Sequence, residues 1–161
     1  MNVEIIGIGS LKESYLREAE REYLKRLSAY LKISVTEIRE ARLPQNAGSA
    51  EEEGVRTREG EALLEAAGKH KNAFVFALDM RGRGPTSEGF AKQIEELSLA
   101  GHSTLVFIIG GSLGLSGEVR KRAGAVISFS AMTFPHQLMR IILLEQIYRA
   151  QKILRNEPYH K

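Results

Sequence analysis

The sequence lacks cysteine and tryptophan altogether and has only four prolines and four histidines among its 161 residues. Without cysteine the chain can form no disulfide, offers no thiolate nucleophile and cannot bind a metal through sulfur. The histidines show neither the H-x-x-x-H nor the H-E-x-x-H spacing that places two imidazoles on one metal ion. These absences exclude disulfide-stapled and thiol-dependent proteins, and we expect no bound metal.

Long hydrophobic runs are also missing. No apolar stretch approaches the roughly 20 residues that cross a bilayer, and the first residues lack the basic flank and apolar core of a signal peptide. Hydrophobic residues make up 43% of the chain and charged residues 27%, which is typical of a soluble globular protein. We therefore expect one soluble, cytoplasmic domain over residues 1–161, since this length suits a single domain.

The formal net charge of +3 is small, but the charge is unevenly distributed. Residues 120–161 carry eight basic and two acidic side chains, whereas residues 37–65 carry four basic and eight acidic ones. A basic segment beside a binding site favours a polyanionic partner such as RNA. The alternative is a solvated basic face without a partner, and charge alone does not separate the two.

Two apolar patterns alternate along the chain. Short apolar runs predict strands at 3–8, 33–38, 72–79, 103–109 and 125–129, and spacings of three to four residues predict helices at 12–31, 49–67, 86–100, 118–123 and 136–154. Ser49 is expected to cap the second helix, with acidic residues in its first turn. The alternation indicates an α/β fold with a mostly parallel sheet between helix layers.

Three loops follow the carboxyl ends of predicted strands, where open α/β sheets bind ligands. They span Asp79–Pro85, Gly110–Gly117 and Ser130–Pro135, and the first two are rich in glycine, which lets a ligand approach the backbone closely. The Gly110–Gly117 loop matches no standard phosphate motif and contains no lysine or arginine. An adenosine without phosphates therefore suits it better than a triphosphate. The alternative is ordinary strand-to-helix turn chemistry.

The last predicted helix, residues 136–154, is apolar on more than one face. Such a helix is buried on most sides, either against a second copy of the chain or as the central helix of one core. Of the two we favour a homodimer interface. Arg140 and Arg149 are nine residues apart, about two and a half turns, and do not share a face. Glu145 lies four residues before Arg149 and is predicted to pair with it.

Two histidines flank that helix. His136 follows Pro135 at the helix start, where the dipole disfavours the imidazolium, so a neutral ring in a capping or packing role is expected ahead of a catalytic one. His160 belongs to the Pro158–Lys161 segment, whose aromatic and basic side chains suit stacking on a base and contact with phosphate. Such a tail otherwise frays.

A set of short motifs in a fixed order resembles the RlmH (YbeA-type) family of ribosomal RNA large subunit methyltransferases. The motifs are Leu78-Asp79, Phe107-Ile-Ile-Gly-Gly-Ser-Leu-Gly114, Ser128-Phe-Ser-Ala-Met-Thr-Phe-Pro-His136, Glu145-Gln-Ile-Tyr-Arg-Ala150 and Pro158-Tyr-His-Lys161. The resemblance covers nearly the whole chain, although residues 41–54 carry no motif and match in length only.

The resemblance implies a SPOUT-type fold with a C-terminal trefoil knot, which periodicity would not suggest because knots are rare. It also implies a homodimer that uses S-adenosyl-L-methionine to methylate N3 of a pseudouridine. That pseudouridine lies in the helix 69 loop of 23S rRNA, on the assembled 70S ribosome. The alternatives are a non-catalytic ribosome-binding or RNA-binding factor that uses the basic C-terminal segment, and an α/β enzyme acting on a nucleotide.

The same resemblance assigns a cofactor pocket to residues at strand ends: Leu78, Gly110, Phe129, Ser130, Ala131, Met132, Thr133 and Phe134. For catalysis the hypothesis is that His160, as general base, and Tyr159 act on the target base, from the partner subunit. Arg149 and Arg140 would stabilise the developing charge or hold phosphate.

Overall fold

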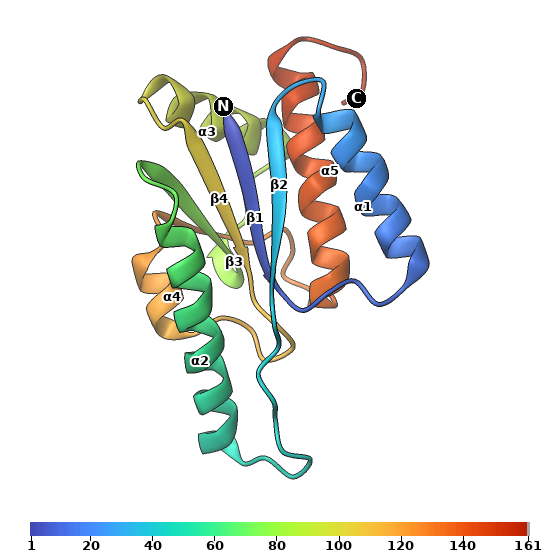
Figure 1. Ribbon diagram of the computed structural model, residues 1–161. Coiled ribbons are helices and arrows are strands. Elements are labelled where there is room, and N and C mark those ends of the chain that lie inside the picture. Colours follow the sequence, from blue (N-terminus) through green and yellow to red (C-terminus); the bar gives the residue numbers. More distant parts are fainter. Residues whose placement is uncertain (161) are drawn as a thin grey trace.

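The computed structural model describes residues 1–160 (Figure 1). Five parallel strands form one sheet in the order β2-β1-β4-β3-β5. The strands are β1 (Asn2–Ile8), β2 (Lys32–Ile38), β3 (Ala73–Arg83), β4 (Thr104–Ile109) and β5 (Ala125–Ile127), and the helices are α1 (Ser14–Leu27), α2 (Ser49–Gly68), α3 (Ser87–Leu99), α4 (Gly117–Arg122) and α5 (His136–Leu154). The predicted α/β fold, with a parallel sheet between helix layers, is confirmed.

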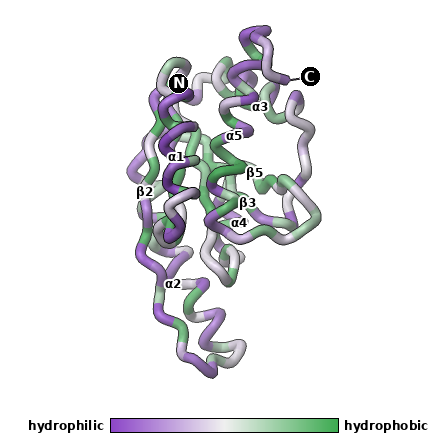
Figure 2. The backbone as a smooth tube through the Cα atoms, turned by 90° about the vertical axis from the view of Figure 1, so that its right-hand side faces the viewer, coloured by the Kyte–Doolittle hydropathy of each residue, from purple (hydrophilic) through white to green (hydrophobic). Residues whose placement is uncertain are grey.

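Different helices cover the two faces of the sheet (Figure 1). Helices α1, α3 and α5 share one core with the strands, which includes Phe90 and Leu143. Helices α2 and α4 build a second core on the other face, which includes Leu63 and Val119. Strand β4 is buried along its whole length, as its continuous apolar sequence predicts. In Figure 2 the strands β3 and β5 are largely hydrophobic and α1 is mostly hydrophilic.

Helix α5 lies between α1 and α3 on the first face. Its own chain therefore covers much of its apolar surface: Leu143, Leu144 and Ile147 are fully buried. This is the arrangement of a central helix in one core, which was the alternative to a dimer interface. The apolar character of α5 consequently needs no second chain to explain it. Within residues 1–160, no helix is both long enough and apolar enough to span a bilayer.

Several element ends differ from the sequence prediction. Helix α1 is shorter than residues 12–31 because the chain turns after Leu27, and β5 ends at Ile127. The N-cap of α2 is Gly48 and not Ser49, and the Glu51 carboxylate accepts a hydrogen bond from the Gly48 N–H at 2.6 Å. That carboxylate satisfies a backbone donor at the helix start, so a capping hydroxyl is not required.

The largest difference is in β3, which continues to Arg83 through residues that predict a turn. The register with β5 is irregular here, and both Leu78 and Arg83 pair with Ile127. Gly82 crosses the β5 backbone so closely that a Cβ atom would lie 2.6 Å from backbone atoms of Val126 and Ile127. Only a glycine permits this approach. Gly82, which by its type suggests a turn, is therefore needed where the two backbones cross.

Candidate functional site

A cavity of about 780 Å³ opens at the carboxyl ends of β3, β4 and β5. Its walls come from the three loops singled out in the sequence, with further residues from α2, α4 and the start of α5. Seven of the eight predicted cofactor residues line it, and Ala131 is the exception: the lining residues are Leu78, Gly110, Phe129, Ser130, Met132, Thr133 and Phe134. The structure thus gathers these residues around one space.

The Gly110–Gly117 loop is folded tightly against the cavity. A Cβ atom on Gly110 would lie 2.8 Å from the backbone carbon of Gly114 and 3.0 Å from Leu115 Cδ2. Gly114 itself has a φ of +77°, a left-handed conformation that favours glycine. Ser112 has the G-x-S-x-G spacing of a serine nucleophile, but among residues 1–160 it makes no hydrogen bond to a histidine. The loop therefore offers backbone groups, without a charged clamp or an activated serine.

An ion pair that the sequence did not reveal closes one side of the cavity. Arg120 Nη1 donates to Asp79 Oδ2 at 3.1 Å and to the Leu115 carbonyl at 2.5 Å, so it joins the end of β3 to the glycine loop. Asp79 also accepts a hydrogen bond from the Arg81 N–H at 2.9 Å. Because Asp79 and Arg120 are 41 residues apart, only the sheet order, which places β3 beside β5, brings them together.

The Ser130–Pro135 loop holds its shape through hydrogen bonds within itself. Ser128 Oγ donates to the Ser130 carbonyl at 2.8 Å, and Ser130 Oγ accepts from the Met132 N–H at 2.9 Å. Its apolar side chains face outward: Met132 is 73% exposed and Phe134 is 36% exposed. Leu138, on the first turn of α5 between the lining residues His136 and Met139, is also exposed.

His136 lines the same cavity and is half-buried at the first position of α5. Burial of the imidazole lowers its pKa, although the nearby Glu40 opposes this shift. Its Nε2 atom is 3.7 Å from Glu40 Oε1 and has no hydrogen-bond partner among residues 1–160. The neutral ring predicted from the sequence agrees with this direction, with desolvation as the leading cause.

The C-terminal residues form a second cluster, on α5 and the start of α3. Arg149 contacts Glu145 at 2.5 Å, which confirms the predicted pair, and its Nη1 is 3.2 Å from His160 Nδ1. Tyr159 donates to Glu145 at 3.1 Å, and His160 Nε2 is 2.8 Å from Glu88 Oε1. A guanidinium can only donate, so His160 Nδ1 is the acceptor and Nε2 carries the hydrogen towards Glu88. Tyr159 and His160 thus pack on the rest of the protein, whereas Lys161, the last residue of the predicted segment, lies outside the described residues.

Two ionisable groups of this cluster have shifted pKa values. Burial, followed by hydrogen bonding with Tyr23, raises the pKa of Tyr159 to about 12, so the phenol stays protonated at neutral pH. The Glu88 backbone N–H, followed by His160, lowers the pKa of the Glu88 carboxyl to about 2. The cluster therefore presents a phenol donor, a guanidinium and an imidazole held by a carboxylate.

Arg140 lies apart from this cluster. It is 3% exposed, and its Nη1 atom is 2.6 Å from Glu37 Oε1 and 3.3 Å from Glu20 Oε2. Its Nη2 atom donates to the Gly9 carbonyl at 2.8 Å. The side chain thus connects α5 to α1 and to the ends of β1 and β2. Of the four predicted catalytic residues, the structure brings together His160, Tyr159 and Arg149, and it engages Arg140 elsewhere.

The cavity and the C-terminal cluster are separate within one chain. Among residues 1–160, none after Met139 lines the cavity. Met139 and Arg149 are ten residues apart on α5, which is about 15 Å along the helix axis. Reacting atoms must approach to about 3 Å before a group is transferred. One chain therefore does not place its own His160 on a ligand in its own cavity.

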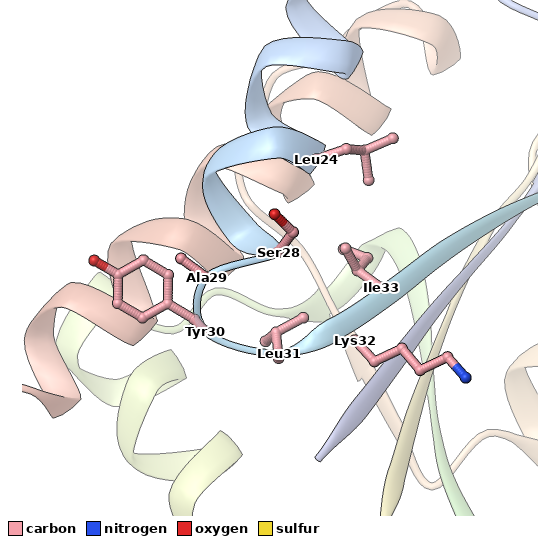
Figure 3. A pocket seen from close by; sticks show the side chains of 7 residues that line it. All are labelled: Leu24, Ser28, Ala29, Tyr30, Leu31, Lys32 and Ile33. Carbon is pink, nitrogen blue, oxygen red and sulfur yellow. The ribbon is translucent and has the colours of Figure 1, made fainter.

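A second hollow, of about 530 Å³, lies between the end of α1 and the start of β2 (Figure 3). It is lined only by residues 24 and 28–33. Because β2 begins at Lys32, the hollow lies at the amino end of this strand, opposite the edge where open α/β sheets bind ligands. The larger cavity is therefore the candidate ligand site.

Comparisons with known proteins agree with one another. A family model described as a predicted SPOUT methyltransferase matches residues 1–160. Proteins named ribosomal RNA large subunit methyltransferase H are 50% identical in Desulfitobacterium hafniense (strain DSM 10664 / DCB-2), over 100% of this chain and 99% of theirs, and 53% identical in Carboxydothermus hydrogenoformans, over 100% of both.

Solved structures give the fold. A probable methyltransferase from Bordetella pertussis Tohama I superposes with a TM-score of 0.56 at 13% identity, covering 92% of this chain and 93% of that one. A probable methylase family protein from Haemophilus influenzae Rd KW20 gives a TM-score of 0.57 at 12% identity, covering 99% of this chain and 70% of that one. At such identities the likeness concerns architecture alone.

Proposed function

The chain belongs to the SPOUT methyltransferase family, and within it to the large-subunit rRNA methyltransferase H (RlmH) group, and on that premise we propose that it methylates N3 of a pseudouridine in the helix 69 loop of 23S rRNA. The proposed methyl donor is S-adenosyl-L-methionine. The proposed substrate is the assembled 70S ribosome, which makes the protein cytoplasmic. The observation that carries rRNA methylation is full-length identity of 50% and 53% to relatives with that name.

The cavity supports the choice of cofactor. It offers backbone groups from the Gly110–Gly117 loop and apolar side chains such as Leu78 and Phe129. The lack of lysine and arginine in the glycine loop suits an adenosine that carries no phosphate. Leu78, Gly110 and residues 129–134 would hold the cofactor, which supplies an electrophilic methyl group on a sulfonium. The tightness of the loop at Gly110 fixes where backbone donors and acceptors point.

The C-terminal cluster has the groups that the acceptor needs. The N3–H of pseudouridine is imide-like and must lose its proton as the methyl group is transferred. In the proposal, His160 Nδ1 accepts this proton once Arg149 turns from it to a carbonyl oxygen of the base. Tyr159, as a protonated phenol, orients the base. Alignment supplies most of the rate, and the base adds a further factor. Arg140 would contribute through the position of α5, since its guanidinium is already engaged.

A homodimer follows from the separation of cavity and cluster. In the proposal, the tail of a second copy reaches the cavity and completes the site. The exposure of Met132, Phe134 and Leu138 supports this arrangement, because a partner would remove these apolar side chains from water. Mixing a Gly110→Ala chain with a His160→Ala chain tests it: mixed dimers should regain up to one working site, whereas sites built within one chain would stay inactive.

The trefoil knot also belongs to the proposal. Its support is the crossing at Gly82, where the end of β3 passes directly against the backbone of β5. Strand β5 is the last strand before α5. Such a crossing is what a threaded chain requires, although knots are rare among folds. The proposal treats residues 1–161 as one methyltransferase domain.

Titration calorimetry with S-adenosyl-L-methionine distinguishes this function from a non-catalytic ribosome-binding factor. We expect saturable binding to the folded protein, lost in Gly110→Ala. Absence of binding by the unmodified, folded protein would favour the binding factor, which would use the basic C-terminal segment and leave the cavity unused.

A further inference from the structure

The cavity is lined by three arginines, and only two of them have a carboxylate partner. Arg56 lies 2.8 Å from Glu53, and Arg120 lies 3.1 Å from Asp79. Arg81 is exposed at the mouth of the cavity and has no carboxylate within 4.0 Å among residues 1–160. Its cation is therefore available to a ligand.

Arg83 repeats this situation two residues further along β3. It too is exposed and has no carboxylate within 4.0 Å in the described part of the chain. Side chains alternate along a strand, so Arg81 and Arg83 project to the same side. Gly82 fixes that side, because its own Cβ direction points into the β5 backbone. The Cα atoms of the two exposed arginines are therefore about 6.6 Å apart along the strand.

We propose that Arg81 and Arg83 form a clamp for two neighbouring phosphates of the rRNA strand that carries the target nucleotide. The proposal rests on the rRNA substrate proposed above. The spacing of the pair is of the order that separates successive phosphates along a nucleic-acid strand, and guanidinium groups suit phosphate because they donate in a fixed fork. The crossing at Gly82 holds the backbone between them in place, so the backbone loses little conformational freedom on binding.

A carboxylate, such as the amino-acid end of the cofactor, suits the pair of Arg81 and Arg83 less well than two phosphates do. It would occupy one arginine and leave Arg83, which does not line the cavity, without a ligand. The basic C-terminal segment, residues 120–161, is also a weaker candidate for binding the rRNA phosphates than its number of basic residues suggests. Five of its cations already have carboxylate partners within the protein: Arg120, Arg122, Arg140, Arg149 and Lys152. Among the described residues, the arginine at the cavity that lacks a carboxylate partner is Arg81, which comes from the end of β3 instead.

The test is the salt dependence of binding to ribosomes whose 23S rRNA lacks the modification. In the Arg81→Gln/Arg83→Gln double variant, the slope of log affinity against log salt should become shallower by about 1.5, since each phosphate contact contributes about 0.7–0.9. Affinity for these ribosomes should fall about tenfold. Arg83→Gln alone, at a residue that does not line the cavity, should leave the affinity for S-adenosyl-L-methionine unchanged. Arg81→Lys/Arg83→Lys keeps both charges and should keep the slope. This variant distinguishes an effect of the lost charge from a disruption of the fold.

The chain supplies a matched control at the other end of the same strand. Lys69 and Lys71 are exposed, two residues apart, and precede β3. Lys69→Gln/Lys71→Gln removes the same charge and should leave the slope unchanged. An equal loss in both double variants would contradict the clamp, because it would reflect net charge alone. Weaker cofactor binding with unchanged ribosome binding would also overturn it. Both readouts are binding measurements, so they remain informative even if methyl transfer itself fails.

Discussion

The Glu88 carboxylate accepts a hydrogen bond from His160 Nε2 across 2.8 Å, and this contact ties the end of the chain to the start of α3. Glu88 fixes which ring nitrogen carries the hydrogen, and Arg149 faces the other nitrogen. A carboxylate in this position orients an imidazole for proton transfer. Glu88 is therefore a positioning residue in the proposed mechanism, although 72 residues separate it from His160.

We expect His160→Ala to slow single-turnover methyl transfer by about 10²- to 10⁴-fold, the usual contribution of a general base. Glu88→Ala should slow it less, by about tenfold, and Glu88→Gln should retain more activity because its amide oxygen still accepts a hydrogen bond. Cofactor affinity should not change in any of them. Glu96→Ala is the control, because Glu96 lies on the same helix and pairs with the exposed Lys92. Near-native turnover in His160→Ala would remove this residue from the mechanism.

The Glu88 contact also has a predicted pH dependence. Because the folded-state pKa is lowered from 4.5 to about 2, the stabilisation is fully present above about 4.5 and is lost as the pH falls towards 2. Nuclear Overhauser contacts between the His160 ring and the Glu88 side chain should persist from pH 7 to pH 5. Release of the ring within that window would show that the carboxylate is not its anchor.

Gly110 and Gly117 occupy the same loop but differ in the space around them. A Cβ on Gly110 would overlap the Gly114 backbone, whereas at Gly117 the nearest atom is 3.9 Å away, on Arg120. We therefore expect Gly110→Ala to weaken cofactor binding by more than tenfold and Gly117→Ala to bind normally, measured by titration calorimetry. Equal affinities in the two variants would mean that the loop conformation does not shape the pocket.

A similar pair tests the backbone crossing. Gly82→Ala places a methyl group 2.6 Å from the β5 backbone and should destabilise the fold by about 3 kcal/mol or more. Gly68→Ala has no atom within 4 Å of the new methyl group and should be neutral, or stabilising by up to about 1 kcal/mol at a helix end. Urea unfolding measures both. A tolerated Gly82→Ala would contradict the close crossing of β3 and β5.

A substitution of Arg140 tests whether this residue stabilises the fold or acts on the substrate. Replacing Arg140 with methionine leaves Glu37 and Glu20 without their cation, and because their side chains are 41% and 19% exposed we expect destabilisation by only about 1–2 kcal/mol. At a temperature where this variant is folded, we expect its single-turnover rate to stay within about threefold of the unmodified protein. A rate loss of the size seen with His160→Ala would instead place Arg140 among the groups that act on the substrate.

The sequence predicted most of the fold because alternating apolar periods define strands and helices locally. It did not predict that β3 continues through Arg81-Gly-Arg83, because this composition is typical of a turn and the strand depends on pairing with Ile127. Glu145–Arg149 was predictable from a spacing of four residues. Glu88–His160 and Asp79–Arg120 were not, because only the tertiary fold brings these pairs together. The burial of α5 likewise depends on α1 and α3, which periodicity cannot place.

We propose that this protein adds one methyl group to a pseudouridine of helix 69. Mass spectrometry of 23S rRNA fragments from a strain lacking the gene tests it most directly. The helix 69 fragment should be lighter by one methyl group at a single pseudouridine, and a plasmid-borne copy, but not the Gly110→Ala chain, should restore the mass. An unchanged helix 69 fragment in the deletion strain would contradict the claim.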